Sequence, residues 1–569
     1  MKTDQKKRFL AILLFLVVVL VIITVNLIKI MLFQAEKYQK AAKNQQQRER
    51  EIKAARGNIY DRNGVILAGN KAVCSISVIH NQIKEPEAVI RNLCSLLELP
   101  EEEVRKKVEK ISAREKIKSN VEKEIGEKIR KLGLGGVMVD EDYKRYYPYK
   151  ELASAVLGFT GADNQGIIGL EVTYDKVLQG KNGKILTWTN ARGIEIKNAP
   201  EEREEAIPGK DLYLTLDVRI QTYAQQICEK VKEAKSANHV SMVVMNPQNG
   251  ELLAMVNVPE FDLNQPYKLN DGSKEGTLSV KEQQERLNKM WRNWCISDTY
   301  EPGSTFKIVT ATAGLESKSV SLKDTFSCPG FRIVEDRRIR CHKAGGHGSE
   351  TFKEGVMNSC NPVFMDVAAR VGKEKMYEYY KKLGLFEKTG VDVPGEANSI
   401  MHKIENVGAV ELATMAFGQS IQITPLQLMR AASAAVNGGR LVTPHFGKRT
   451  SEKTYQYREV KNAVSKETSE TMREVLEAVV AEGSGKRAAI DGYRIGGKTA
   501  TSEKLPRGTG KYISSFLGFA STQRPTVMAL ILIDEPEGTY YGGTIAAPAV
   551  KELFENILPY LGMKQSFAP

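Results

Sequence analysis

The 569-residue sequence predicts an α+β protein in several parts: one N-terminal membrane helix, an elongated middle domain, and a larger C-terminal domain with a central antiparallel sheet between helical layers. The length exceeds what one hydrophobic core usually supports, so two or three domains are expected. Strand-like runs occur at 241–245 and 252–256 and again at 516–520 and 527–533, with helical patterns between them and a terminal helix at 547–561. Strands at both ends of a segment with helices between them are typical of an α+β domain.

The N-terminal segment predicts a membrane anchor. Residues 9–28 run for 20 positions without a charge, which is enough to cross a bilayer as a helix. Basic residues precede the run and no small-residue cleavage site follows it, so we expect an uncleaved signal anchor. The expected parts in chain order are a cytoplasmic tail (1–8), a transmembrane anchor (9–28), a polar, helix-favouring stalk (29–50), a middle domain (51–215) and a C-terminal domain (216–569). We expect a single-pass protein of the cell membrane with its large domains outside the cytoplasm.

Local signals define some elements of the middle domain. Asn63-Gly64 lies between apolar runs and predicts a hairpin turn that leads into a strand at 65–67. Residues 98–132 carry apolar side chains at helical spacing, which predicts small amphipathic helices. The alternating strand at 208–217 ends in Asp217, which we expect to cap a helix at 218–234.

The formal net charge is +13, which raises the question of a nucleic-acid partner. Acidic and basic residues are mixed throughout the chain, however, and no basic motif with interleaved aromatic residues is present. We therefore interpret the charge as a solvated surface with some attraction to anionic lipid or wall polymer, and we expect no nucleic-acid partner.

A Ser-x-x-Lys tetrad at Ser304-Thr305-Phe306-Lys307 is the strongest candidate for chemistry. Gly303 precedes it and an apolar helical run follows it, so Ser304 should lie in the first turn of a buried helix, with Lys307 on the same face. Burial lowers the pKa of a lysine by desolvating its charge, and a neutral amine can take the hydroxyl proton of a serine. The tetrad thus points to acyl transfer, although a single tetrad of this kind is usually coincidental.

Two distant motifs support a functional role for that tetrad. Ser359-Cys360-Asn361 and Lys498-Thr499-Ala500 follow it in the order and at spacings that resemble the penicillin-binding transpeptidases, which share their fold with serine β-lactamases. Further similar stretches lie at 417–427 and 541–548, and those at 56–64 and 166–171 resemble the pedestal of class B, monofunctional members. The resemblance covers nearly the whole chain, and within class B it is greatest to sporulation, division and elongation transpeptidases of Gram-positive bacteria.

The resemblance implies a role for each motif residue. Ser304 would attack the bond between the terminal D-alanines of a peptidoglycan stem peptide, Lys307 would take its proton, Ser359 would relay it, and Asn361 would hold the substrate. Lys498 and Thr499 would bind the terminal carboxylate, and the backbone N–H groups of Ser304 and Thr501 would form the oxyanion hole. β-Lactams would mimic the donor, no organic cofactor is expected, and the family precedent for a partner is a membrane glycosyltransferase.

Position 500 departs from the usual pattern of the family. Ala500 stands where the family usually has glycine, and its methyl group could crowd a ligand, so we expect retained activity with an altered drug profile.

Residues 335–342 (Glu-Asp-Arg-Arg-Ile-Arg-Cys-His) imitate the acidic motif of a glycosyltransferase domain. That domain would precede the serine, so we interpret the string as coincidental.

The cysteines suggest a metal site. The seven cysteines include Cys328, Cys341 and Cys360, which with His347 follow a Cys-x12-Cys-x5-His-x12-Cys pattern. Three thiolates and one imidazole are a complete tetrahedral shell for structural zinc, and the spacing resembles the zinc site of some elongation-type class B enzymes. A disulfide, which suits an extracytoplasmic compartment, and buried free thiols are the alternatives, and His342 could replace His347 as a ligand.

Other functions on the same fold remain open from the sequence. A penicillin sensor, or a scaffold that recruits a glycosyltransferase without catalysis, would use the same domain. A sensor needs a cytoplasmic signalling domain, which a tail of eight residues cannot supply, and a scaffold would tolerate loss of the motif side chains, which are all present. A β-lactamase shares the fold and the serine, but the anchor and the long middle domain argue against it. We therefore predict a D,D-transpeptidase, in spore cortex or septal wall synthesis.

Overall fold

The structure is a computed structural model that describes residues 2–38, 47–112, 114–188, 202–273, 278–520 and 525–565. The chain forms two units whose segments alternate along the sequence. The first unit comprises residues 1–55, 70–144 and 180–209, and the second comprises residues 56–69, 145–179 and 210–569. The sequence predicts one boundary near residue 215, with the whole middle domain before it. In the structure, residues 56–69 and 145–179 of that expected middle domain belong to the second unit.

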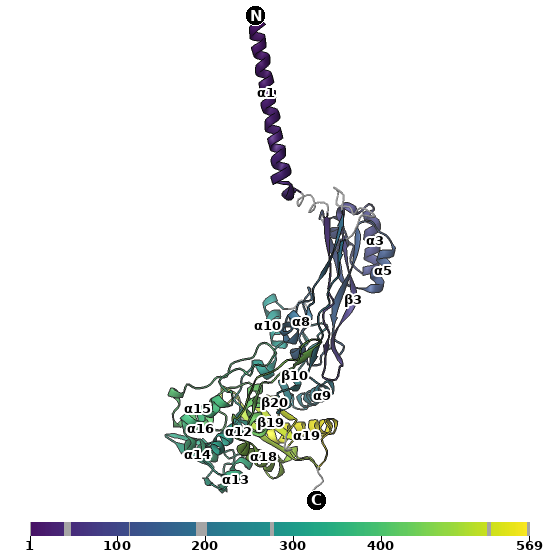
Figure 1. Ribbon diagram of the computed structural model, residues 1–569. Coiled ribbons are helices and arrows are strands. Elements are labelled where there is room, and N and C mark those ends of the chain that lie inside the picture. Colours follow the sequence, from purple (N-terminus) through teal and green to yellow (C-terminus); the bar gives the residue numbers. More distant parts are fainter. Residues whose placement is uncertain are drawn as a thin grey trace. The chain divides into compact units, whose positions relative to one another are not determined.

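The first unit begins with helix α1 (Lys2–Ile28), which continues into a short π-helix, η1 (Lys29–Phe33). The most apolar 18-residue window within Gln5–Phe33 has a mean hydropathy of 3.2, and this helix is long and apolar enough to cross a membrane. Its apolar side chains are exposed, as a lipid-facing helix requires, and it is coloured purple in Figure 1. The apolar N-terminal helix that the sequence predicts is therefore present.

The rest of the first unit combines two sheet segments with three helices. Its helices are α3 (Pro86–Leu97), α4 (Glu101–Glu109) and α5 (Lys123–Lys131), and its strands are β1 (Gln47–Ile52), β4 (Glu115–Glu122), β6 (Gly183–Trp188), β7 (Glu202–Glu204) and most of β3 (Ile66–Val78) and β5 (Val137–Tyr146). Strand β1 pairs antiparallel with β6, so the end of the expected helical stalk is a strand; residues 39–46 lie outside the described part.

The prediction of helices throughout 98–132 is wrong for one segment. Ile117 and Val121 lie in β4, where both are buried and Val121 pairs with Cys74 of β3. A spacing of four residues puts two side chains on one face of a helix, but it also puts them on one face of a strand. The short apolar pattern could not distinguish the two, and the pairing with β3 decided it.

In the second unit, β2 (Ile59–Tyr60) and the start of β3 form the hairpin that Asn63-Gly64 predicts. The carboxylate of Asp61 closes the turn by accepting hydrogen bonds from the backbone N–H groups of Asn63 and Val65, both at 2.8 Å. Strand β8 (Leu212–Leu214) is shorter than expected. Helix α9 (Val218–Ala234) begins as predicted, because the Asp217 carboxylate accepts from the backbone of Arg219 and Ile220.

A five-stranded antiparallel sheet organises the second unit, in the order β10-β9-β20-β19-β18. The strands are β9 (His239–Met245), β10 (Leu252–Val258), β18 (Ile495–Glu503), β19 (Tyr512–Ala520) and β20 (Met528–Asp534). The last three strands come from the C-terminal part of the chain, and β9 pairs with β20. The central antiparallel sheet of the predicted α+β fold is therefore confirmed.

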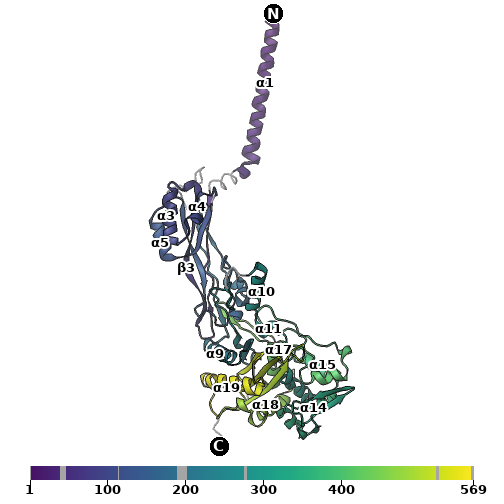
Figure 2. The same ribbon diagram turned by 180° about the vertical axis from the view of Figure 1, so that it is seen from behind.

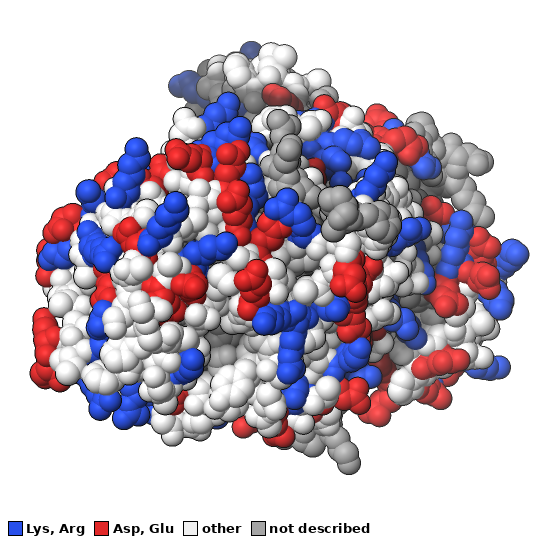
Figure 3. Space-filling view, turned by 90° about the horizontal axis from the view of Figure 1, so that it is seen from below, with Lys and Arg blue, Asp and Glu red and all other residues white. Residues whose placement is uncertain are grey.

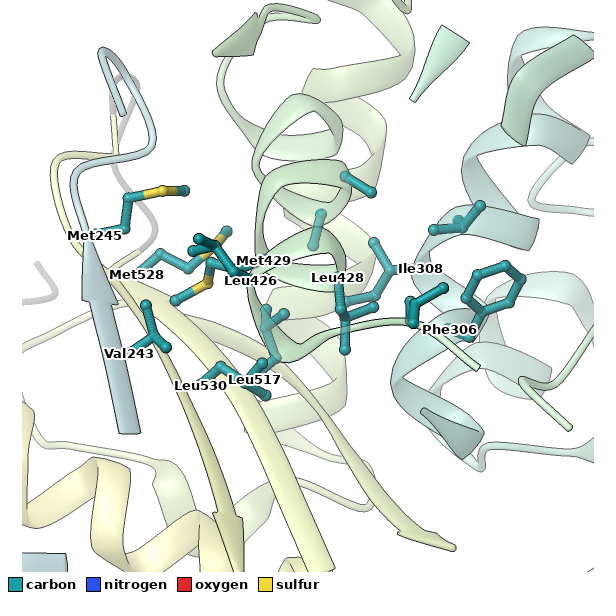
Figure 4. Close-up of a cluster of buried hydrophobic side chains, with 14 of the residues drawn as sticks. Val243, Met245, Phe306, Ile308, Leu426, Leu428, Met429, Leu517, Met528 and Leu530 are labelled. Carbon is teal, nitrogen blue, oxygen red and sulfur yellow. The ribbon is translucent and has the colours of Figure 1, made fainter. Parts of the chain in front are cut away.

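Helices cover both faces of this sheet. On one face, α9 and the terminal helix α19 (Gly542–Tyr560) pack together over alternate residues of β9 and β20, and the two helices lie side by side in Figures 1 and 2. The other face carries Val243, Leu517 and Leu530, which pack towards α17 (Pro425–Val436) as Figure 4 shows. Because side chains alternate along a strand, one sheet supplies both cores.

Helix α12 (Lys307–Glu316) packs against α14 (Asn361–Val371), α15 (Lys373–Lys382), α17 and α18 (Lys466–Ala481). The other helices of the second unit include α6 (Ser154–Leu157), α7 (Gly169–Thr173), α8 (Asp175–Leu178), α10 (Val280–Met290), α11 (Trp294–Ser297), α13 (Phe352–Met357) and α16 (Ala409–Met415). Two small strand pairs, β11 (Thr325–Cys328) with β14 (Gly348–Thr351) and β12 (Phe331–Val334) with β13 (Arg337–Arg340), lie between α12 and α13 in sequence.

Candidate active site

Ser304 lies in a single 3-10 turn, Gly303–Phe306, that leads directly into α12. The sequence predicts the first turn of a buried helix here, and the structure has a 3-10 turn at this position. In a 3-10 helix, residues i and i+3 are eclipsed, so the tighter turn still puts Ser304 and Lys307 on one side. The side chains of Phe306 and Ile308 anchor the turn in the core between α12 and α17 (Figure 4).

Lys307 is fully buried, and its ammonium group contacts the second motif. Its Nζ donates to the Ser359 carbonyl at 2.7 Å, to the Ser359 hydroxyl at 3.2 Å and to Asn361 Oδ1 at 2.7 Å. Within the described part of the chain, it makes no hydrogen bond to the Ser304 hydroxyl. Burial lowers the pKa of Lys307 to about 8, because the surrounding dipoles solvate its charge less well than water does.

The turn that carries Ser304 is held by close backbone contacts. Gly303 has a φ of +55°, and its N–H donates to the carbonyl of Gly418 at 3.0 Å. A Cβ atom at position 303 would lie 2.2 Å from Ser502 Oγ on β18. Only glycine therefore allows the serine turn to approach both the 417–427 stretch and the edge of the sheet.

Ser359 has a left-handed backbone, with a φ of +54°. This conformation is unfavourable for a residue with a side chain, and such outliers concentrate at functional sites. Here it lets the carbonyl and the hydroxyl of one residue both face the Lys307 ammonium. Helix α14 starts at the next motif residue, Asn361, whose side-chain amide donates to the carbonyl of Arg340 at 3.1 Å.

Strand β18 brings the third motif to the same place. It is the edge strand of the sheet, so the backbone on its outer side is available to a ligand. Lys498 is fully buried, and burial, together with the nearby charge of Lys307, lowers the pKa of Lys498 well below its usual value. Thr499 Oγ1 contacts Ser484 Oγ at 3.3 Å, and the Thr501 hydroxyl accepts from the Gly542 N–H at 2.9 Å.

Ala500 is buried, with 3% of its surface exposed. A Cβ atom built on Gly303 would lie 3.6 Å from the Ala500 methyl carbon, so this methyl group faces the serine turn from below. The residue can therefore influence the site through the position of the turn as well as through contact with a ligand.

The expected metal ligands meet in one cluster. One ligand atom from each of Cys328, Cys341, His347 and Cys360 lies within 4.8 Å of the other three. His347 Nδ1 is 3.6 Å from the sulfur of Cys328 and 3.7 Å from that of Cys341. The alternative ligand, His342, lies 3.8 Å from the Cys341 sulfur. All seven cysteines are free thiols in this structure.

Two contacts of the site had little signal in the sequence. Ser484, next to Thr499, stands in a Gly-Ser-Gly string whose Gly483 packs against the carbonyl of Met357. Glu301, three residues before Ser304, accepts from the backbone of Ser420 at 2.8 Å and from Arg507 at 2.6 Å. The glycines around Ser484 are the one hint that a close backbone approach occurs there.

Comparison with known proteins agrees with this arrangement. A family model described as penicillin binding protein transpeptidase domain matches residues 240–555, and one described as penicillin-binding protein dimerisation domain matches residues 51–214. The chain therefore belongs to the penicillin-binding protein transpeptidase family, with the pair of domains found in its class B members.

Individual relatives extend over most of the chain. Stage V sporulation protein D of Bacillus subtilis (strain 168) is 41% identical over 98% of this chain and 86% of that protein. The probable peptidoglycan D,D-transpeptidase PenA of a serogroup A strain of Neisseria meningitidis is 30% identical over 91% of this chain and 86% of that protein.

Solved structures share the fold. Penicillin-binding protein 2X from Streptococcus thermophilus has a TM-score of 0.73 at 21% identity, over 92% of this chain and 83% of that one. Penicillin-binding protein 3 from Mycobacterium tuberculosis, complexed with ampicillin, has a TM-score of 0.68 at 25% identity, over 91% of this chain and 98% of that one.

Proposed function

We propose that the protein is a peptidoglycan D,D-transpeptidase that works through an acyl-enzyme on Ser304. The observation that carries this proposal is the buried Lys307, which lies one turn from Ser304 and contacts both Ser359 and Asn361. With a pKa of about 8, Lys307 is neutral in a useful fraction of molecules near neutral pH. A neutral amine beside a serine hydroxyl is what a nucleophilic serine requires.

The reaction proceeds in two acyl transfers. Ser304 Oγ attacks the carbonyl carbon between the two terminal D-alanines while Lys307 Nζ accepts the hydroxyl proton. The proton passes through the Ser359 hydroxyl to the leaving nitrogen, and the terminal D-alanine departs as its amine. The amine of a second stem peptide then attacks the ester on Ser304 and returns the proton to the serine.

The edge of β18 positions the donor. Lys498 has no carboxylate partner within the described residues, so the terminal carboxylate of a stem peptide would supply the missing counter-charge, and the Thr499 hydroxyl would donate to it. The backbone N–H groups of Ser304 and Thr501 would face the oxygen that becomes negative in the transition state. A β-lactam, whose carboxylate and strained amide imitate this donor, would acylate Ser304 and remain there.

Mass spectrometry after incubation with a labelled penicillin tests the proposal. We expect one stable adduct on Ser304 in the full-length protein and none in Ser304→Ala. The penicillin-sensor and scaffold alternatives differ at the next step, because only the enzyme crosslinks or exchanges D-alanine on a stem peptide. Absence of an adduct on folded wild-type protein would refute the enzyme.

We also propose that Cys328, Cys341, His347 and Cys360 hold a structural zinc ion. The Cys₃His set suits zinc, and tetrahedral bonds of about 2.3 Å to sulfur and about 2.0 Å to nitrogen place neighbouring S and N ligands roughly 3.5 Å apart. The observed S–N distances of 3.6 and 3.7 Å support this fit. Zinc, when bound, would crosslink the loop of Ser359 and Asn361 through Cys360 without taking part in the acyl transfer.

Metal analysis of protein purified without chelator tests the site. We expect about one zinc per chain, loss of that zinc in Cys341→Ser, and a lower unfolding temperature after chelation. Substoichiometric zinc, with an unfolding temperature insensitive to chelators, would contradict it. Peptide mapping of a Cys328–Cys341 or Cys341–Cys360 bridge would instead favour the disulfide alternative.

The cellular setting follows from the anchor and the relatives. We propose that α1 spans the cell membrane once and that the catalytic domain is extracytoplasmic, where its substrate lies. The 41% identity to Stage V sporulation protein D supports a role in spore cortex or septal wall synthesis. A membrane glycosyltransferase would supply the glycan strands, because the two matched domains are a transpeptidase domain and a dimerisation domain. Protease protection in spheroplasts and co-purification with such an enzyme test these two points.

A further inference from the structure

A hollow of about 740 Å³ lies beside the candidate active site, between the β12–β13 hairpin and helix α16. The hairpin contributes residues 335–339 and the helix side contributes Val410, Glu411, Thr414 and Ser420. The lining holds three carboxylates, Glu335, Asp336 and Glu411, and two guanidinium groups, Arg337 and Arg338. The string at 335–342, which the resemblance leaves without a role, thus supplies most of one wall.

The hairpin wall is fixed against the second unit. Arg332 pairs with Asp366 of α14, and Val334 and Ile339 pack against a small core of Met365, Ala413 and Phe417. At its base the hairpin is flanked by two residues of the cysteine cluster, since Cys328 precedes it and Cys341 follows it. The N–H of Cys341 donates to the Gly330 carbonyl at 2.8 Å, which closes the base. A hairpin held in this way can present its charges in fixed positions.

Both walls are connected to the catalytic cluster by short hydrogen-bonded paths. On the hairpin side, the carbonyl of Arg340 accepts from Asn361, which in turn accepts from Lys307. On the helix side, the hydroxyls of Ser420 and Thr414 are 3.0 Å apart, and Gly418, two residues before Ser420, accepts from Gly303. The hollow therefore opens next to the turn that carries Ser304.

The charges in the hollow are only partly neutralised by one another. Arg338 stacks on the ring of Phe331 with its guanidinium carbon 3.8 Å from the centroid, and it forms no ion pair within the described residues. Arg337 reaches only its neighbour Asp336, at 4.0 Å. Acidic and basic side chains are interspersed over the face shown in Figure 3. In this hollow, both signs converge on one concave surface, which suits a ligand with a carboxylate and an amine close together.

We propose that this hollow binds the charged middle part of the donor stem peptide, with Arg338 and Arg337 receiving its carboxylate and Glu411 its free amine. The proposal rests on the proposed transpeptidase function and extends it from the terminal D-alanines to the rest of the substrate. Two stems enter the reaction, the acylating donor and the attacking acceptor. The amine of the acceptor is the nucleophile that attacks the ester on Ser304, so only the donor has an amine free to contact Glu411, and we assign the hollow to the donor.

The test compares Arg338→Ala with Arg449→Ala in the full-length protein. Arg449 is a matched control, because its guanidinium carbon also stacks on an aromatic ring, that of Tyr213, at 3.7 Å, but it lies in β16 (Gly447–Thr450), outside the lining of the hollow. Two synthetic stems ending in D-Ala-D-Ala are used. One carries a free amine and carboxylate on its diamino acid, and the other has the amine acetylated and the carboxylate amidated.

For each variant, the kcat/KM for a stem is divided by the rate of acylation by benzylpenicillin. We expect this ratio to fall about tenfold for the charged stem in Arg338→Ala. A tenfold fall corresponds to about 1.4 kcal/mol of transition-state binding. The capped stem should show no such fall, and Arg449→Ala should behave as the wild type with both. This loss should appear in the formation of the acyl-enzyme from the donor stem.

Three results would overturn the inference: equal losses for charged and capped stems, a proportional loss of penicillin acylation, or the same change in Arg449→Ala. A failure of the proposed function looks different, because the wild-type protein itself would then not be acylated on Ser304. Glu411→Gln offers an independent variant, and it should weaken only stems with a free amine.

Discussion

Two buried cationic networks in the second unit differ in their counter-charges. Arg56 donates to Glu171 at 2.6 Å and to Asp175 at 2.7 Å, and Arg145 donates to the other oxygen of Glu171 at 2.7 Å. Lys307 and Lys498 are equally inaccessible, yet neither forms an ion pair within the described part of the chain. The first network surrounds each buried cation with carboxylates, and the second surrounds it with carbonyl, hydroxyl and amide groups.

This difference separates a structural role from a chemical one. Carboxylates at contact distance raise the pKa of Arg56 against the opposing effect of burial, so its charge is permanent. Lys307 meets only neutral hydrogen-bond acceptors, so burial dominates and lowers its pKa. A buried cation that can lose its proton near neutral pH can act as a base, whereas a fully paired one can only hold segments together. The pair of Arg56 and Glu171 holds the segments 56–69 and 145–179 together in this way.

The largest effect should follow replacement of the unpaired lysine. We expect Lys307→Met to lower the rate of acylation by a fluorescent penicillin by about 10²–10⁴-fold, because the proton acceptor is lost. The unfolding temperature should stay the same or rise, since an apolar side chain of similar length replaces a buried charge without a carboxylate partner. A large loss of stability with retained acylation would reverse the roles that we assign to the two networks.

The complementary change is Arg56→Met, which leaves Glu171 with one cation fewer in a buried position. We expect a loss of about 3–5 kcal/mol in the free energy of unfolding, measured by denaturant titration. Arg105→Met is the matched control, because Arg105 also contacts three carboxylates, Glu87, Glu101 and Glu109, but at the surface. The loss in the free energy of unfolding of Arg105→Met should be at most about 1 kcal/mol. Equal losses in the two variants would show that burial does not determine how much a paired arginine contributes to the free energy of unfolding.

The pH dependence of acylation sharpens the comparison further. In the proposed mechanism Lys307 is the base, and it can accept a proton only when it is neutral, that is, above its pKa. The acylation rate should therefore rise with pH and level off above about 8. Stopped-flow acylation measured from about pH 6 to about pH 10 gives the midpoint. A midpoint near the ordinary lysine value of 10.5 would mean that burial does not shift the group.

The same shift bears on stability with a defined sign. Because the folded-state pKa of Lys307 lies below the value of 10.5 in the unfolded chain, the unfolded state binds more protons between about pH 8 and 10.5. Stability should therefore increase with pH across this window for the wild type relative to Lys307→Met. Arg56 should contribute no such slope, because its raised pKa keeps it charged throughout this window.

The smallest effect is expected at Ala500. We expect Ala500→Gly to change acylation rates by roughly two- to tenfold, with different factors for β-lactams of different size, because a methyl group below the serine turn is removed. Stability should fall by about 0.5–1 kcal/mol, as for glycine in the interior of a strand. Identical acylation rates for all β-lactams tested would show that the methyl group has no influence on the site.

The sequence predicted more of the site than of the first unit. Ser304, Lys307, Ser359, Asn361 and Lys498 come together as expected, because long, ordered motifs on regular elements leave few alternative arrangements. Residues 115–122 were assigned to a helix and form a strand, since a short apolar spacing fits both periods. The hollow beside the β12–β13 hairpin had no sequence signal, because it depends on α16, which begins 69 residues after Arg340.

The sequence by itself determined the anchor, the α+β class, the order of the three motifs and the set of four metal-ligand candidates, because these depend on residue type and local periodicity. Only the tertiary structure decided what each buried charge faces. Whether Lys307 meets carboxylates or neutral dipoles depends on how α12, α14 and β18 pack, and that choice sets its pKa. The same packing places Arg338 in one hollow with residues of α16, without an ion pair to any described residue, since long-range contacts rather than neighbours in sequence fix the electrostatics of a buried or concave site.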